Sequence, residues 1–304
     1  MQSRQFRRPK SAEKGVQTIT NHMIDIKNLD FGYVKAWPVF RDFSLQLPEG
    51  NVYGLLGKNG TGKSTLLYLI SGLLRPKSGS VFVDNFKSTA RRPEMLREIM
   101  LVPEEYDLPD ITLDSYVKVN APFYPNFSQE ALRQNLQEFE LPNKIRLGRL
   151  SMGQKKKVII SFALAAGTKY LFMDEPTNGL DIPSKAQFRR VVAANMNPAR
   201  TVIISTHQVR DVETLIDHVV MISQQNVLLN SSISELSRSL RFEIRQSGEQ
   251  QTDVLYAEPS LQGNFVIAYN NGDEPTMVNL ELLFNAVSCG ALQPSMIVSP
   301  AENA

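Results

Sequence analysis

The chain has 304 residues, of which 42% are hydrophobic and 21% are charged, and its formal net charge is +2. This composition is ordinary for a globular protein, and we expect one main domain with an appendage. No apolar stretch approaches the ~18 residues that span a bilayer, and the basic N-terminus lacks the apolar core of a signal peptide. We therefore expect a cytoplasmic protein in which Cys289, the one cysteine of the sequence, is a buried and inert thiol.

The positive charge is concentrated at the start of the chain. Residues 1–22 carry five basic side chains and one acidic side chain, and the first patterned segment begins at Met23. We expect these residues to be a disordered basic tail, with a basic arm for an anionic membrane or nucleic acid as the alternative. The remainder of the chain is slightly acidic, so no nucleic-acid partner is expected.

Residues 23–56 have the pattern of short strands, with a turn at residues 48–51. The apolar residues that alternate with polar ones are Ile24, Ile26, Phe43, Leu45 and Leu47. This pattern predicts an antiparallel β start. A further strand is predicted at residues 79–83, and a mostly helical segment at about residues 105–150, in which Ser128 caps a helix.

A glycine-rich turn joins an apolar run at residues 52–56, typical of a buried strand, to the helical spacing of residues 64–70. It consists of Gly57, Lys58, Asn59, Gly60, Thr61, Gly62, Lys63 and Ser64, with Thr65 following on the helix. Glycines let backbone N–H groups approach an anion, and a helix N-terminus adds partial positive charge. We therefore interpret the turn as a binding site for a nucleotide's phosphates; the alternative is a chance match of the pattern in a glycine-rich loop. Lys63 would reach the β- and γ-phosphates, and the Ser64 hydroxyl would bind Mg²⁺.

From residue 151 the sequence alternates between helix and strand. Helices are predicted at residues 154–166 and 184–196, and strands at residues 169–174 and 201–205. The alternation predicts an α/β fold with a mostly parallel sheet covered by helices, in which ligands bind at the carboxyl ends of the strands. The residues at those ends are Asp174, Glu175 and His207.

These three residues suit phosphate chemistry. Asp174 can hold Mg²⁺, and Glu175 can orient or deprotonate an attacking water. His207 can donate to a γ-phosphate. The alternatives are an exposed acidic pair and a structural histidine; the catalytic roles are preferred because the residues share a sheet with the phosphate loop.

Five motifs in this order resemble the ATP-binding cassette (ABC) family, specifically the ATPase subunit of a transporter. They are the phosphate loop; Leu150-Ser151-Met152-Gly153-Gln154, similar to the family signature L-S-G-G-Q; the strand ending in Asp174-Glu175; Gly179-Leu180-Asp181, similar to the D-loop; and the switch histidine His207. The resemblance covers residues 24 to about 235. It implies an ATP-binding domain at residues 23–235, with a P-loop core, an antiparallel β subdomain and a helical subdomain at about residues 105–165.

The resemblance also implies that two cassettes sandwich two ATP molecules, each phosphate loop facing the signature of the opposite subunit. In that role Ser151 offers a hydroxyl and Gly153 an open N–H at a helix start, next to Gln154. Taken alone, the segment would be an ordinary helix cap. Asp181 is expected to align the two sites across the dimer.

Tyr33 lies where the family places an aromatic residue that stacks on adenine, with Phe31 and Trp37 as competitors and a core tyrosine as the alternative. Two positions depart from the family pattern. Met152 replaces the second signature glycine, and Glu104 follows Pro103 where a glutamine is expected. Glu104 is predicted to offer oxygen to Mg²⁺, against the alternative of a solvated loop acid.

The implied function is an ATPase that powers transport, as a homodimer or as a heterodimer with another such subunit. It would bind separate integral membrane permease subunits at the inner face of the cell membrane, using the helical middle around residues 123–127. Export is favoured over import. The alternatives are a soluble ABC ATPase acting on nucleoprotein in translation or DNA repair, disfavoured because the chain has no tandem cassette or long heptad insertion, and a nucleotide-sensing regulator, opposed by Glu175 and His207.

Residues 236–304 are expected to form a small C-terminal α+β extension. Residues 264–269 have a strand pattern, and residues 280–284 are similar to the closing helix of export-type ATPase subunits.

Overall fold

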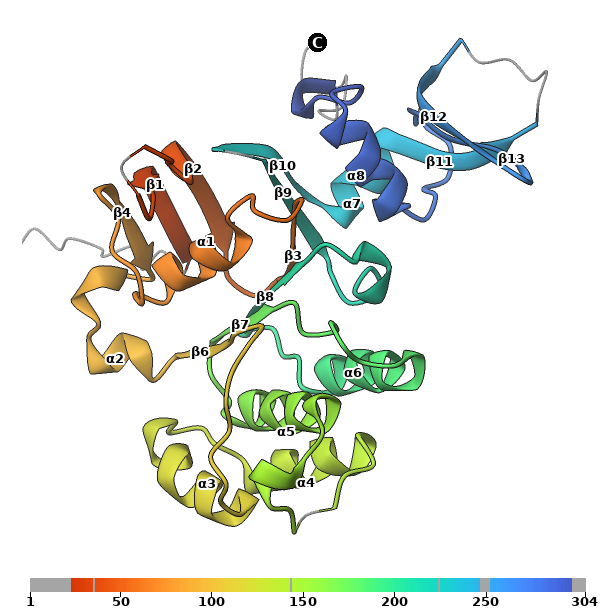
Figure 1. Ribbon diagram of the computed structural model, residues 1–304. Coiled ribbons are helices and arrows are strands. Elements are labelled where there is room, and N and C mark those ends of the chain that lie inside the picture. Colours follow the sequence, from red (N-terminus) through yellow and green to blue (C-terminus); the bar gives the residue numbers. More distant parts are fainter. Residues whose placement is uncertain (1–22, 35, 143, 224, 247–251, 297–304) are drawn as a thin grey trace, which may run out of the picture.

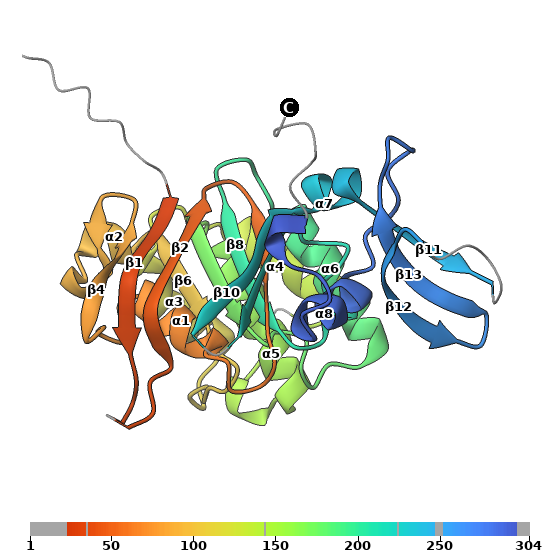
Figure 2. The ribbon, with the colours of Figure 1, turned by 90° about the horizontal axis from the view of Figure 1, so that it is seen from above.

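The computed structural model describes residues 23–34, 36–142, 144–223, 225–246 and 252–296, which form three sheets and their covering helices (Figure 1). Figure 2 shows the N-terminal sheet and the C-terminal sheet at opposite ends of the molecule, with the central sheet between them. The predicted basic tail, residues 1–22, lies outside the described residues. The α/β class with a mostly parallel sheet is confirmed.

The N-terminal sheet is antiparallel and has the strand order β2-β1-β4-β5. Its strands are β1 (Met23–Phe31), β2 (Phe40–Pro48), β4 (Ser78–Val83) and β5 (Phe86–Lys87). The alternating apolar residues of β1 and β2 are buried, as predicted. The antiparallel prediction was wrong for β3 (Val52–Leu56), which pairs in parallel with two strands of the central sheet. All five of its residues are buried, which requires strands on both sides and cover on both faces.

The central sheet has the order β10-β9-β3-β8-β7-β6 and is parallel except for β10. Besides β3, its strands are β6 (Ile99–Val102), β7 (Tyr170–Asp174), β8 (Thr201–Thr206), β9 (His218–Ser223) and β10 (Asn226–Ser232). Side chains alternate between two cores. Tyr170 and Phe172 pack with α1 (Lys63–Ile70) and the N-terminal sheet, whereas Leu171 and Met173 pack with α5 (Met152–Ala165) and α6 (Ile182–Ala194).

Strand β6 was not predicted, because four apolar residues after a short helix carry too little periodicity to distinguish a strand. The helices before and after it are α2 (Pro93–Leu96), α3 (Leu113–Asn120) and α4 (Gln129–Glu138). The Ser128 side chain accepts a hydrogen bond from the N–H of Ala131 and caps α4, as the sequence predicts.

The C-terminal part contains α7 (Ile233–Ser239), the antiparallel sheet β11-β13-β12 and α8 (Leu280–Ser288). The strands are β11 (Leu240–Arg245), β12 (Val254–Ser260) and β13 (Gly263–Tyr269). The Arg210 guanidinium donates to Glu281 at 2.5 Å and ties α8 to the central body. Cys289 is exposed rather than buried, because it is the C-cap residue of α8, beyond the apolar face that packs inward. Among the described helices, none is long and apolar enough to cross a membrane.

Candidate functional site

The phosphate loop runs from the end of β3 to the start of α1. Gly62 has φ +102°, and a Cβ there would come within 2.7 Å of Val39 and 2.8 Å of the Phe40 ring. Only glycine fits this turn. No side chain caps α1, so the first-turn N–H groups of this helix are open to an anion.

Lys63 is held inside the loop. Its Nζ donates to the carbonyl oxygen of Gly57 at 2.8 Å and that of Lys58 at 3.4 Å, and lies 3.8 Å from Glu175 Oε1. Burial lowers the pKa of Lys63, and the carboxylate of Glu175 opposes this shift. Thr61 closes the same loop by donating from its hydroxyl to the Lys58 carbonyl at 2.9 Å.

The adjacent parallel strands β7 and β8 bring the predicted acids and histidine together. The Asp174 carboxylate accepts from the Ser205 hydroxyl. Glu175 Oε1 accepts from the backbone N–H of His207 at 3.1 Å and lies 2.8 Å from His207 Nδ1, and its other oxygen accepts from Thr206 at 3.1 Å. Glu175 has the left-handed backbone conformation, with φ +44°, in which its N–H donates to the Ser205 carbonyl at 3.0 Å.

A cavity of about 640 Å³ unites much of the predicted site. Its lining residues are Tyr33, Val39, Asn59, Gly60, Gly62, Lys63, Ser64, Thr65, Glu104, Glu175, Asn178 and His207. Gly57, Lys58, Thr61 and Asp174 belong to the flanking loop and strand ends. Val39 and Asn178 were not predicted from the sequence as lining residues. Asn178 could have been predicted, because it is a polar amide only three residues after Glu175.

Tyr33 offers an exposed ring at this cavity, because 64% of the residue is accessible. Its hydroxyl lies 3.2 Å from Thr65 Oγ1, and its ring meets that of Phe31 edge to face with centroids 5.1 Å apart. Phe31 is buried, and Trp37, although exposed, does not line the cavity. Tyr33 is therefore the aromatic residue placed to contact a ligand there.

Glu104 follows β6 and also faces the cavity. Its Oε1 accepts a hydrogen bond from Asn178 Nδ2 at 2.9 Å. No group of three or more His, Cys, Asp or Glu side chains among the described residues is arranged to hold a metal ion.

The signature segment lies outside this cavity. Ser151 caps α5 in a reciprocal capping box with Gln154, and Met152 is 72% exposed. A Cβ at Gly153 would meet one atom within 4 Å, the Gly179 carbonyl oxygen at 3.8 Å. Asp181 caps α6 by accepting from the Ser184 N–H at 2.9 Å, and the hydrogen bonds from Ser184 lower the pKa of Asp181.

This fold and this site define a P-loop nucleotide hydrolase. A family model described as "ABC transporter" matches residues 40–178. The chain is 31% identical over 218 residues to the ABC transporter ATP-binding protein NatA of Bacillus subtilis, covering 69% of this chain and 88% of that one. It is also 31% identical over 218 residues to the lantibiotic transport ATP-binding protein SrtF of Streptococcus pyogenes, covering 68% and 90%.

A solved structure of an ATP binding subunit of an ABC transporter has the same fold, with a TM-score of 0.63, 24% identity and coverage of 71% of this chain and 92% of that one. The chain belongs to the ABC transporter family. It is an ATP-binding and ATP-hydrolysing subunit of a membrane transport system.

Proposed function

We propose that this chain hydrolyses ATP with Mg²⁺ in a head-to-tail dimer that drives separate permease subunits. The observation that carries the proposal is the division of the site. The phosphate loop, Glu175 and His207 line one cavity, whereas the signature segment is exposed outside it. The ATP-binding domain is residues 23–235, and residues 236–304 form an extension.

ATP is expected to lie along the cavity from Tyr33 to His207. The Tyr33 ring stacks on adenine, and the backbone of residues 57–65, Lys58 and Asn59 included, surrounds the phosphates. Lys63 exchanges its carbonyl partners in the loop for phosphate oxygens. Because an ammonium bonded to two carbonyls is not neutralised by them, this exchange is favourable.

The residues present fit Mg²⁺, a cation that prefers oxygen ligands. Ser64, Asp174 and Glu104 offer a hydroxyl and two carboxylates, and bound Mg²⁺ would neutralise charge on the β- and γ-phosphates. To bind Mg²⁺, the Glu104 carboxylate would give up its hydrogen bond from the Asn178 side chain.

The ligand role of Glu104 is tested with Mn²⁺ in place of Mg²⁺. The electron paramagnetic resonance spectrum of the Mn²⁺–ATP complex should change in Glu104→Ala, since a carboxylate leaves the coordination sphere. An identical spectrum in the variant would reject Glu104 as a ligand.

Hydrolysis is assigned to Glu175 and His207. The Glu175 carboxylate takes a proton from the attacking water, because its hydrogen bonds from Thr206 and the His207 N–H fix its direction. The His207 ring, 37% exposed at its side chain, turns from Glu175 to donate to the γ-phosphate.

The central experiment is Glu175→Gln, which keeps the shape of the side chain and removes the base. Turnover should fall by ~10²–10⁴-fold, while ATP still binds and dimers accumulate on size-exclusion chromatography. Wild-type turnover in this variant would refute the assignment of Glu175.

The second subunit is proposed to bind the γ-phosphate with its Ser151, Gly153 and Gln154. Its Asp181 is proposed to lie at the dimer interface and to align the two sites. At the N-terminus of α5 the Ser151 cap is exposed and Gly153 is half-buried with space at its Cβ position, so the helix dipole is available to an anion from another chain. A homodimer and a heterodimer would both satisfy this arrangement.

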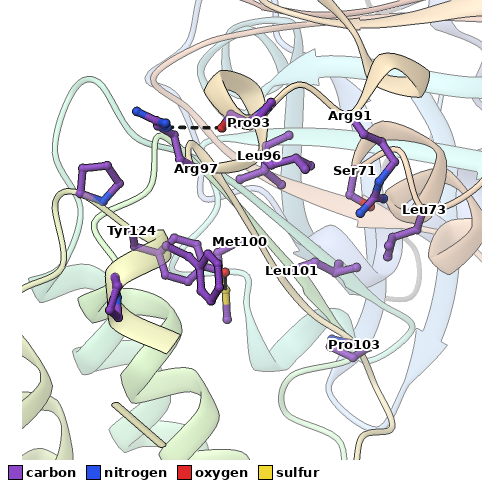
Figure 3. Close-up of a pocket in the computed structure, with 14 residues that line it drawn as sticks. Ser71, Leu73, Arg91, Pro93, Leu96, Arg97, Met100, Leu101, Pro103 and Tyr124 are labelled. Atoms are coloured by element: carbon purple, nitrogen blue, oxygen red, sulfur yellow. Dashed lines mark hydrogen bonds between the residues drawn. The ribbon is translucent and has the colours of Figure 1, made fainter. Parts of the chain in front are cut away.

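A groove of about 760 Å³ is the proposed docking site for the permease, at the inner face of the cell membrane (Figure 3). Leu96, Met100, Leu101 and Tyr124 line it, with the Tyr124 hydroxyl 3.1 Å from Met100 Sδ, and Arg91 and Arg97 lie at it. Apolar lining with basic residues suits a short helix that carries an acidic side chain. Export is the proposed direction, on the overall resemblance of the sequence to export-type ATPase subunits.

A further inference from the structure

Lys156 of α5 is a buried lysine that lies beside residues 175–178, the loop that follows β7, and it does not line the cavity of about 640 Å³. It is 5% exposed. Its Nζ donates to the carbonyl oxygen of Glu175 at 3.2 Å and to that of Asn178 at 2.9 Å. The signature helix is thereby bonded to both ends of the short segment from Glu175 to Asn178.

The same segment is bonded to Glu104. The Asn178 side chain donates to Glu104 Oε1 at 2.9 Å, while its main chain accepts from Lys156. Asn178 lies in the loop after β7 and connects it to two parts of the chain that are far away in sequence. One is Glu104, which follows β6, and the other is the second turn of α5.

Carboxylates outnumber ammonium groups at this place, and loss of Lys156 would increase the imbalance. Three carboxylates, those of Asp174, Glu175 and Glu104, act on the two buried lysines of the region, Lys63 and Lys156. Burial lowers the pKa of Lys156, and Glu104 is the strongest of the carboxylates that oppose the shift. A glutamine at position 104 would bring no charge, whereas the acid at this position brings a negative charge that Asn178 links to the buried ammonium of Lys156.

We propose that Lys156 is a positioning residue that offsets the charge of Glu104 and holds the main chain of residues 175–178, so that Glu175 faces the attacking water. The catalytic half of this inference rests on the proposed role of Glu175. The charge offset rests on the hydrogen bonds that join Asn178 to both Lys156 and Glu104, and it is tested without nucleotide or Mg²⁺.

The first test is a thermal denaturation cycle on the full chain with Lys156→Met, Glu104→Gln and the double variant. Lys156→Met should lower the Tm by ~5–15 °C, because it leaves buried carbonyls unpaired and the carboxylates without their counter-charge. The double variant should recover at least about half of that loss, because one carboxylate is removed with the lysine. Lys155→Met is the matched control, since Lys155 is half-buried one residue earlier on α5, and it should leave the Tm within ~2 °C of the wild type.

An equal loss of Tm from Lys156→Met in the presence and absence of Glu104 would overturn the charge offset and leave Lys156 with a purely structural role. If Lys156→Met does not fold, the double variant must fold for the proposal to hold. A double variant that is also unfolded contradicts it.

The second test separates positioning from binding. Lys156→Met should lower kcat by ~10–100-fold, because a small displacement of Glu175 is enough to lose this much, with KM for ATP within ~3-fold of the wild type. A raised KM with unchanged kcat would contradict the positioning role. Should Glu175→Gln keep its turnover while the Tm cycle still shows coupling, the assignment of Glu175 fails and the charge offset remains.

Discussion

The phosphate-loop region and the signature region differ in how deeply the chain buries their side chains. Lys63 and Glu175 are buried, each with hydrogen-bond partners supplied by neighbouring strands and loops. The signature segment has a well-formed helix start, but Met152 is exposed and Gly153 has open space in front of it. The difference teaches that this chain's own strands and loops enclose one region, while the other is left accessible at the surface.

The strongest way to break this comparison is Gly153→Asp. The substitution has room within the chain, so the Tm and the ATP affinity of the isolated protein should stay unchanged. Turnover should fall by ~10²-fold, because a carboxylate would meet the γ-phosphate bound to the other subunit and remove stabilisation of the kind supplied by an oxyanion hole. Steady-state ATPase rates over a range of protein concentrations measure this, and full activity in the variant would count against the shared site.

Lys63→Ala tests the internal region. ATP affinity should fall by ~10–100-fold, since a charge-assisted hydrogen bond to phosphate is lost. Equilibrium binding of a fluorescent ATP analogue to the isolated chain gives the ratio directly. An ATP affinity equal to that of the wild type in this variant would show that Lys63 does not bind the phosphates of ATP.

Much of the phosphate-loop region and of the signature region was predictable, because the residues of each motif are contiguous in the sequence. Ser151 and Gln154 stand three residues apart, which is the spacing of the capping box that the structure shows. The runs that end in Asp174 and precede His207 are apolar enough to predict buried parallel strands.

The remainder depends on contacts between distant segments. Nothing in the local sequence places Asn178 against Glu104, because β6 is too short to be recognised and its neighbour β7 lies about seventy residues further along the chain. The partners of Lys156 were missed for the same reason, since periodicity shows that a helix position is buried but not which carbonyl groups meet it.

The smallest expected effect is that of Ser151→Ala. Losing the cap of α5 should reduce the free energy of unfolding by ~1 kcal/mol, which denaturant titration resolves. Gly153→Asp serves as the control that leaves the cap in place. An unchanged stability in Ser151→Ala would mean that the capping box contributes nothing to the stability of the chain.

The left-handed backbone of Glu175 also has a consequence for substitution at this position. A side chain held at φ +44° costs on the order of 1–3 kcal/mol that glycine would not incur. Glycine would relieve that cost, but the Thr206 hydroxyl and the His207 N–H would then lose the carboxylate that accepts from them. The turn after β7 is therefore strained at the residue whose side chain holds the end of β8 in place.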